Sequence, residues 1–496
     1  MANSTEPRPA STHLDILALE ELKKGHLKPR IPERGEGVFY DPRLDLKDPE
    51  GTILTSQLLD AFLTARSMRR VRGRDVWELR IRKTAANLLR AHYYRQPSSV
   101  LYFRGAAVSL YDDQPKWMRH GALKTVVDAL AKAGLVSSIT GKKMPWYSET
   151  ASYASSVWAS NDLIGLAERL GVSRNSIVSH VADHDLVQLF SAKEKLVFDP
   201  ITLELSRAKK GQRIRFDKTK ETEEWVHFLK SINSFYRSQR IEFGLGAGSS
   251  EIRVSDGQGV LNEECSQRRT PEVFLTDLYR VFNYGQADGP SFHSGGRFFG
   301  AWWMSLPEQT RKEITINKQS VVELDYANCH PRMLYHQRGL NYVGDLYRIP
   351  EVEEHERESG LRLGAFRPYI KWLMQVLLNC CGRPDLVEVP ADIVCPKGLS
   401  RGQIVDYVRR SHAPISEAFG TGVGLELMRI ESDIAYEIMN TAMKEGWPVL
   451  SVHDSFLAAA GRAEALLGIM KECYKKRLGF QPVIKGMETT ENHNST

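Results

Sequence analysis

The strongest constraint on the fold of this chain is an apolar, β-branched run that ends on an aspartate. The run is Val321-Val-Glu-Leu-Asp325, and a segment of helical character follows it up to Tyr335. β-Branched and apolar residues favour strands that are packed in a sheet. We therefore expect a strand that ends at Asp325, then a turn, and then a helix. This order places one carboxylate where the edge of a sheet meets a cleft.

A second aspartate lies far downstream in a similar setting. Asp454 falls within the hydrophobic segment Trp447–Leu457, which has Gly446 before it and a predicted helix from Ala463 after it. Apolar runs separated by a short polar turn are typical of a β-hairpin. The sequence therefore predicts that two carboxylates, each carried by a strand, meet on one sheet.

Paired carboxylates of this kind suit the transfer of a nucleotidyl group to a free 3′-hydroxyl. In such reactions two Mg²⁺ ions, roughly 3.5–4 Å apart, clamp the attacking and leaving oxygens. Mg²⁺ prefers hard oxygen ligands and keeps several waters, so two aspartates and one backbone carbonyl suffice. We expect the metal ligands to be Asp325, Asp454 and the carbonyl of Tyr326, with Mn²⁺ as an alternative ion.

A third element lies between the two aspartates, in the segment Arg367–Gly382. Residues four apart share one helix face, and here they form a polar stripe on an otherwise apolar helix. The stripe residues are Arg367, Lys371, Gln375 and Asn379. Pro368 is compatible only with a first turn, so the helix should begin at Arg367. A cationic stripe facing two carboxylates suits a triphosphate, and Lys371 would neutralise charge or protonate the leaving pyrophosphate.

Taken in order, these three elements resemble motifs A, B and C of the family A polymerases. That superfamily joins the polymerase I type DNA polymerases with the phage-type single-subunit RNA polymerases. The similarity covers roughly Phe292 to Gly486. Within it, Gly295-Gly296-Arg297-Phe298-Phe299 resembles the Gly-Arg element that contacts the primer or product end in both branches. The resemblance implies an α+β fold, a right hand of palm, fingers and thumb.

The resemblance also implies a role for each matching residue. The implied catalytic residues are Asp325, Asp454 and Lys371. The residues expected at the incoming nucleotide are His330, Arg367, Lys371, Gln375 and Asn379. Those expected at nucleic acid are Arg297 and His453. The implied partners are a DNA template with its primer and nucleoside triphosphates.

The chain departs from the family pattern at positions that govern sugar choice. His330 stands where the DNA polymerases usually carry Glu and the RNA polymerases carry Gly. Gln375 and Asn379 stand where Phe or Met, and then Tyr, are usual. A serine follows the His-Asp pair, as in the RNA polymerases, and nothing that resembles a proofreading exonuclease precedes the palm. The choice between deoxynucleotides and ribonucleotides therefore stays open.

The N-terminal third has the order of helices and strands that is typical of a winged helix. The predicted elements are helices over 77–95 and 120–133, strands over 100–103, 135–139 and 155–158, and a basic turn over 141–145. In this motif one helix can lie in the major groove of DNA while the hairpin contacts the backbone. The cations expected at DNA are Lys124, Lys132, Lys142 and Lys143. A winged helix used only for protein contacts is the alternative.

A chain of 496 residues has room for two to four domains. We expect a flexible arm over 1–50, a winged-helix-like DNA-binding domain over 51–200, a helical connector or thumb-like region over 201–285, and the palm and fingers over 286–496. An amphipathic helix over 221–240 falls in the third region.

The overall charge is only +6, so nucleic-acid contacts must come from local clusters such as Met68–Arg74 and Arg207–Arg215. None of the six cysteines has C-x-x-C or Cys/His ligand spacing, which favours a reduced, cytoplasmic setting. No apolar stretch approaches the ~20 residues that span a bilayer. A membrane role is therefore not expected.

The favoured function is a template-directed nucleotidyltransferase, a DNA polymerase of a mobile element. A primase or a single-subunit RNA polymerase is the alternative. A rival of another class is a DNA-binding regulator that keeps the polymerase fold only for structure, against which the intact motif residues argue. Metal-dependent phosphohydrolysis through His453 and Asp454 would need further ligands that the sequence does not supply.

Overall fold

The computed structural model shows an α+β chain that divides into two compact units. Unit 1 comprises the residues up to Pro42 together with Asp48–Arg174, and unit 2 comprises Arg43–Lys47 together with the chain from Asn175 onward. The structure describes residues 37–94, 98–102, 121–141, 154–191, 211–244, 275–285, 291–380 and 387–486.

The described residues of unit 1 form a small sheet and four helices. Its elements are β1 (Val38–Phe39), α2 (Glu50–Ala65), α3 (Arg74–Tyr94), β3 (Val100–Tyr102), α4 (Ala122–Lys132), β4 (Val136–Ile139), β5 (Ser155–Ala159) and α5 (Asn161–Arg169). The strands are ordered β1-β3-β5-β4, with β5 antiparallel to both of its neighbours. Helices α2, α3 and α4 pack together and bury Phe62, Leu89 and Val126 completely. The helices and strands predicted for this region are confirmed to within a few residues at each end.

Unit 2 contains most of the chain. Its strands are β2 (Leu44–Leu46), β6 (Ile177–Ser179), β7 (Val187–Ser191), β8 (Arg213–Ile214), β9 (Ile241–Phe243), β10 (Tyr279–Gly285), β11 (Gly295–Phe299), β12 (Ile314–Ile316), β13 (Gln319–Tyr326), β14 (Leu450–Val452), β15 (Ser455–Ala459) and β16 (Ile484–Lys485). Its helices are α6 (Lys220–Ser238), α7 (Glu308–Arg311), α8 (Cys329–Gln337), α9 (Pro350–Glu358), α10 (Arg367–Asn379), α11 (Arg401–Ser411), α12 (Gly424–Lys444) and α13 (Ala463–Leu478).

The unit boundaries differ from the expected domain boundaries at two places. The predicted arm was to extend to residue 50, but β1 pairs with β3 and β2 pairs with β6, so part of it belongs to sheets. The predicted DNA-binding domain was to end near residue 200, but β7 pairs in parallel with β10, which draws residues 175–191 into unit 2. Residues 1–36 of the predicted arm lie outside the described residues.

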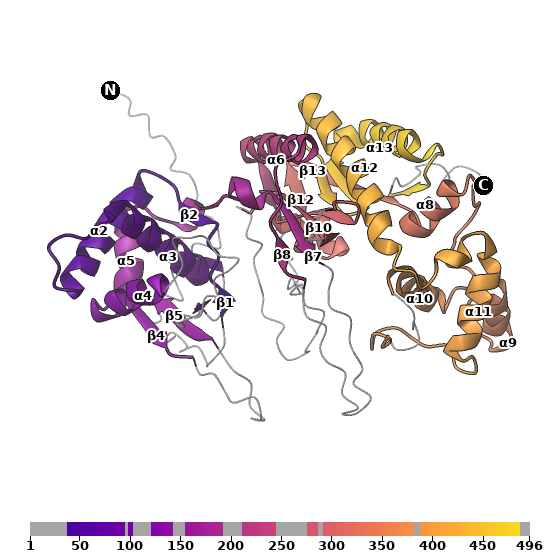
Figure 1. Cartoon of the computed structure of the whole chain (residues 1–496), viewed down its shortest axis with the longest axis horizontal. Coiled ribbons are helices and arrows are strands. Elements are labelled where there is room, and N and C mark those ends of the chain that lie inside the picture. Colours follow the sequence, from indigo (N-terminus) through magenta and orange to yellow (C-terminus); the bar gives the residue numbers. More distant parts are fainter. Residues whose placement is uncertain are drawn as a thin grey trace, which may run out of the picture. The chain divides into compact units, whose positions relative to one another are not determined.

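The largest sheet of unit 2 is organised around β13. Its strand order is β14-β15-β13-β12-β9, and β16 pairs with the end of β13. Helix α13 packs on β13 and β15, and α12 lies beside α13 and α6 (Figure 1). Leu324 of β13 and Phe456 of β15 are buried beneath these helices. The sheet thereby fixes Tyr326, the last residue of β13, which directly follows the predicted catalytic Asp325.

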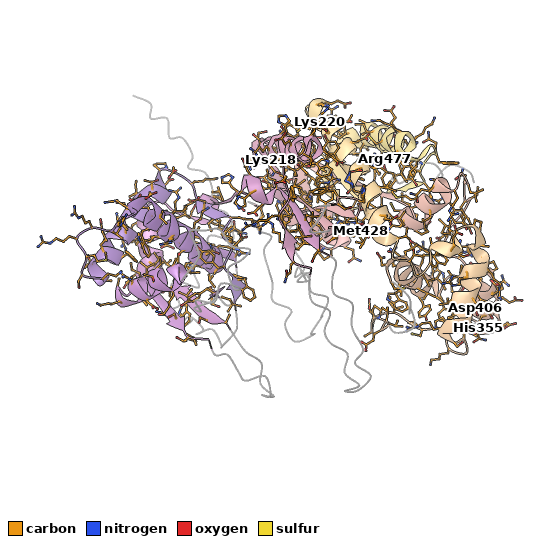
Figure 2. The ribbon with its side chains drawn as sticks, in the orientation of Figure 1. Lys218, Lys220, His355, Asp406, Met428 and Arg477 are labelled. Carbon is orange, nitrogen blue, oxygen red and sulfur yellow. The ribbon has the colours of Figure 1, made fainter. Side chains whose placement is uncertain are left out.

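Helix α12 also contacts β11, a strand of the second sheet, which is ordered β11-β10-β7-β8. A Cβ atom at Gly296 would fall 2.8 Å from Ser432 Oγ of α12, so only glycine permits this close approach. The buried Arg280 of β10 donates to Ser432 and forms an ion pair with Asp433. Arg477 of α13, labelled in Figure 2, binds the same carboxylate. Helix α12 therefore links the two sheets.

Helices α9, α10 and α11 form a separate group within unit 2 (Figure 1). Helix α9 packs against α11, and these two helices carry His355 and Asp406, labelled in Figure 2. Helix α10 contacts α12, which connects the group to the sheets. Within the described ranges, no helix is both long and apolar enough to cross a bilayer.

Candidate active site

The two aspartates singled out from the sequence meet in the structure. Asp325 lies opposite Ser455 in the β13–β15 register, so Asp454 is adjacent to it across the strands. The amide of Tyr326 donates a hydrogen bond to the carbonyl of Asp454, at 3.2 Å. The two strands of the predicted hairpin, β14 and β15, are joined by His453 and Asp454 alone, and His453 takes a left-handed φ of +59° that suits so tight a turn.

The electrostatics of this pair indicate a site for a cation. Burial and the charge of Asp454 raise the pKa of Asp325 to about 7. Burial and the charge of Glu431 also raise the pKa of Asp454. Two hard carboxylates that repel each other fit a divalent ion, which would relieve the repulsion. Among the described residues no group of three or more His, Cys, Asp or Glu side chains is arranged for a metal.

Tyr326 presents only its backbone to this pair. Its ring is buried against Phe456, and its hydroxyl donates to the carbonyl of Met470 at 2.7 Å. The phenol is therefore a structural anchor for the end of β13, and the carbonyl is the only oxygen that Tyr326 can offer to a metal.

Lys371 is one of two lysines whose charges act on Asp325. The helix begins at Arg367 with Pro368 in its first turn, as predicted, and Lys371 is exposed one turn later. Its positive charge opposes the rise in the pKa of Asp325, as does the charge of Lys485 on β16. No ion pair involves the Lys371 ammonium in the described part of the chain, which leaves it available to an anion.

Arg367 differs from Lys371, because its guanidinium already has a partner. Nε donates to the carboxylate of Asp345 at 2.5 Å, and the guanidinium lies 5.2 Å from the ring centre of Tyr347. Asp345 also accepts from Asn328, and together these contacts lower its pKa to about 2. To bind the nucleotide as predicted, Arg367 would therefore have to contact Asp345 and the nucleotide at once, or release Asp345.

The last two residues of the stripe are positioned by packing between helices. The Asn379 amide donates to the carbonyl of Gln375 at 2.8 Å. A Cβ atom at Gly424, the first residue of α12, would fall 2.1 Å from Asn379 Oδ1. Asn379 therefore lies against the start of α12, while Gln375 lies close to the buried Tyr347. The polar stripe itself is confirmed, since its residues are exposed or half-buried and Leu373, Met374 and Leu377 on the other face are buried.

Glu431 of α12 is a site residue that the sequence did not reveal. This carboxylate is 3% exposed and receives Nε and Nη2 of Arg297 at 2.9 and 2.6 Å. Nε2 of His330, which is 5% exposed, lies 2.7 Å from Oε2, the same oxygen that accepts from Nη2 of Arg297. These partners hold the pKa of Glu431 at about 2 despite its burial. Arg297 and His330, predicted to touch nucleic acid and nucleotide, are thus fixed by a common carboxylate.

His453 has a different environment from His330. Burial and the charge of Arg297 lower its pKa to about 4, so the imidazole is neutral at physiological pH. Its ring contacts Phe299 edge-on, with 5.9 Å between the ring centres. The predicted contact of His453 with nucleic acid would therefore be made by a neutral aromatic ring.

The predicted DNA-binding lysines of unit 1 are only partly described. Lys124 of α4 forms an exposed ion pair with Asp128, at 2.7 Å. Lys132 is exposed at the end of α4. Lys142 and Lys143 lie outside the described residues.

Comparisons with known proteins provide little further guidance. No protein family model matches the chain, and no curated protein matches it. Among solved structures, the chain is similar to the POL domain of Pol1 from M. smegmatis in complex with DNA primer-template and dNTP. The identity is 14%, the TM-score is 0.20, and the match covers 36% of this chain and 41% of that chain. At this level of similarity the function must be argued from the residues of the site.

Proposed function

We propose that this chain is a template-directed nucleotidyltransferase, a DNA polymerase of family A type with a right-hand fold. The observation that supports the proposal most is the pairing of the Asp325 and Asp454 carboxylates near Lys371, which has no ion pair among the residues that the structure describes. Such a combination suits a reaction in which anionic phosphates are held against a metal-binding carboxylate pair. A primase or single-subunit RNA polymerase is the alternative, because the residues at the sugar-selecting positions depart from both branches of the family.

Each residue of the site has a task in this reaction. Bound at Asp325, Asp454 and the carbonyl of Tyr326, Mg²⁺ would supply charge neutralisation and activation of the attacking hydroxyl. Lys371 would hold the triphosphate by charge and give a proton to the departing pyrophosphate. Glu431 would keep Arg297 and His330 in fixed orientations, so that the primer end and the sugar meet preorganised groups.

The experiment that tests the proposal is incorporation of labelled nucleotide on a primed DNA template, with Mg²⁺ and with a chelator. Metal-dependent extension is the expected result. Hydrolysis of the triphosphate without extension would indicate a phosphohydrolase instead. DNA binding with neither reaction would favour a regulator that keeps the fold for structure alone.

The proposal includes a role for unit 1 as a winged-helix module that places the enzyme on duplex DNA. The order of α2, α3, β3, α4, β4 and β5, with β5 between β3 and β4, supports this assignment. Helix α4 would enter the major groove.

We expect the full chain to bind duplex DNA with an affinity that falls steeply as salt rises, because its cations displace counterions from phosphate. Lys132→Ala should lower the slope of log K against log salt by about 0.9, whereas Lys124→Ala should change it less, since Asp128 already pairs with Lys124. Fluorescence anisotropy over a salt series measures both slopes, with Lys444→Ala as the control. Binding that is independent of salt would favour a protein-interaction role for unit 1.

His330 is expected to contribute to sugar choice. An imidazole is bulkier than the glycine of the RNA branch, and Glu431 holds it in place at 2.7 Å. We therefore predict a preference for deoxynucleotides with measurable use of ribonucleotides. His330→Gly should shift the ratio toward ribonucleotides by roughly 1–3 kcal/mol of pocket discrimination, about 5- to 150-fold.

Incorporation efficiencies for matched dNTP and NTP pairs measure this shift. Glu431→Gln should shift the ratio in the same direction but less, because the ring is retained while its anchor is weakened. His293→Gly, a change at an exposed histidine, is the control. If the ratio of dNTP to NTP use is unchanged in His330→Gly, His330 does not determine sugar choice. A preference of the wild type for NTPs favours the RNA polymerase or primase alternative.

A further inference from the structure

Asp345 is a carboxylate that lies between two elements of the candidate active site. Its Oδ1 accepts a hydrogen bond from the side-chain amide of Asn328 at 3.0 Å, and Asn328 is the N-cap residue of α8, just after the end of β13. Both oxygens of Asp345 also accept from Arg367, the first residue of α10. One side chain therefore connects the turn that follows Asp325 to the helix that carries the polar stripe.

The loop that carries Asp345 is held in place on both sides of this residue. The guanidinium of Arg332, a residue that is 3% exposed, donates to two loop carbonyls just before Asp345, at 2.7 and 2.9 Å. The buried His412 donates from Nε2 to the carbonyl of Leu346, directly after Asp345, at 2.9 Å. Neither contact involves Arg367. The core of unit 2 therefore sets the position of Asp345, and the arginine is oriented by it.

The contact with Asp345 uses only one edge of the Arg367 guanidinium. Nε donates to Oδ2 at 2.5 Å, and Nη2 donates to Oδ1 at 3.2 Å. Nη1 has no hydrogen bond or ion pair within the described ranges, and the side chain is 32% exposed. A guanidinium presents five N–H donors in a planar fork. Arg367 can therefore keep Asp345 and still donate from Nη1 to a second oxyanion.

The ring of Tyr347 adds a second constraint on this guanidinium, which lies 5.2 Å from the ring centre. An arginine side chain loses much rotamer entropy when it binds an anion, and one that is already held loses less. Lys371, one turn later on the same face, has no ion pair among the described side chains. It provides charge without a fixed direction, whereas Arg367 provides a directed donor.

We propose that Asp345 is a positioning residue of the triphosphate site, which holds Arg367 so that Nη1 donates to a phosphate oxygen while Nε and Nη2 stay on Asp345. The assignment rests on the proposed function and adds a residue that is not part of the polar stripe. The rival arrangement is a latch, in which Arg367 leaves Asp345 to reach the nucleotide. Removal of the carboxylate separates the two, because it weakens nucleotide binding if Asp345 positions Arg367 and strengthens it if Asp345 is a latch.

The test is calorimetric binding of a dNTP, and separately of inorganic triphosphate, to the full chain with Mg²⁺ and a primer–template that ends in a dideoxynucleotide. Asp345→Asn keeps an oxygen for Asn328 and replaces the acceptor of Arg367 Nε by an amide. It should weaken binding of both ligands by about 10-fold, as expected for a lost hydrogen bond between charged groups. In primer extension KM for the dNTP should rise by about the same factor, while kcat changes by less than about 3-fold.

Two further variants show whether the effect passes through Arg367. In an Arg367→Lys background, which keeps the charge but not the fork, Asp345→Asn should cause no further loss of triphosphate binding. Glu353→Gln, which breaks the exposed ion pair with Arg348, is the matched control and should change neither binding nor melting temperature. Asp345→Ala, which removes both acceptor oxygens, should weaken binding at least as much as Asp345→Asn.

The outcomes that would overturn the proposal are distinct. Tighter binding by Asp345→Asn and Asp345→Ala would show a latch, and unchanged binding would remove both arrangements. Additive losses in the double variant would mean that Asp345 acts on the triphosphate by another route than Arg367. Absence of metal-dependent extension by the unsubstituted chain would instead remove the proposed function, whereas extension with unchanged KM in Asp345→Asn would remove the positioning role alone.

Discussion

Asp325→Asn is expected to lower the rate of nucleotide incorporation by roughly 10³-fold or more. The substitution removes one of two carboxylates that would hold the metal, which is worth several kcal/mol of transition-state stabilisation. Asp454→Asn should have an effect of the same order, because the two residues face each other across β13 and the β14–β15 turn. Single-turnover extension of a primed template with saturating Mg²⁺ measures the loss.

The same substitution should not destabilise the metal-free fold. The pKa of Asp325 rises from its ordinary 3.8 to about 7 in the folded chain. A carboxyl with a raised pKa in the folded state destabilises the fold progressively between those two values, and fully above the higher one. In a chelator, Asp325→Asn should therefore melt at or above the wild-type temperature at pH 8 and close to it at pH 4.

These two readouts separate a site residue from a structural one. Asp392→Asn, at an exposed aspartate, should change neither activity nor melting temperature. Near-normal extension by Asp325→Asn or Asp454→Asn would remove the paired-carboxylate mechanism. A large fall in melting temperature at pH 8 would mean that Asp325 is needed for the fold.

Lys371→Ala is expected to slow incorporation by about 10²-fold or more with little change in DNA affinity. The estimate follows from the loss of a preorganised charge partner for the transferring phosphate. Lys371 has no ion pair to break within the described residues, so its removal should leave the melting temperature nearly unchanged. Rapid-quench measurement of a single addition at varied dNTP concentration separates the maximal rate from nucleotide affinity.

Two further lysines control this experiment. The charge of Lys485 also lowers the pKa of Asp325, but Lys485 lies on β16 and not on the polar stripe. Lys485→Ala should therefore lower the incorporation rate far less than Lys371→Ala. Lys444→Ala, at the end of α12, should have no effect. If Lys371→Ala weakens only primer–template binding, then α10 faces nucleic acid and not the triphosphate.

The local structure around the aspartates was predictable because the signals are short in range. Each signal determines one helix or strand by itself. The β-branched run that ends at Asp325 predicts β13, the proline predicts the start of α10, and the two apolar runs around His453 and Asp454 predict the β14–β15 hairpin. The meeting of the two aspartates is not a local signal, because β13 and β15 are farther apart in the chain than β7 and β10; it was expected from the resemblance of the three elements, taken in order, to a known set of motifs. The unit boundary at Arg174 was not predictable, since it depends on the parallel pairing of β7 with β10, residues nearly a hundred positions apart.

The partners of the cationic residues were missed for a related reason. Glu431 meets Arg297 and His330, and Asp345 meets Arg367, only through tertiary packing. One signal for Glu431 does exist in the sequence. It lies at helical spacing between Leu427 and Ala435 on the buried stripe of α12, where an acidic residue requires buried partners. Asp345 lies in a loop, so no helical spacing of apolar residues marks it as a buried position.

The position of β13 in the chain has a consequence for biosynthesis. During translation this strand, rich in valine and leucine, leaves the ribosome long before β15 and β16, whose residues Ala459 and Lys485 pair with Val321 and Asp325. An unpaired strand edge of this kind is prone to misfolding and to chaperone binding until its partner strands have been synthesised. A nascent or truncated chain that stops before β15 would therefore lack the partner strand of β13, and the pair of Asp325 and Asp454 would come together only near the end of synthesis.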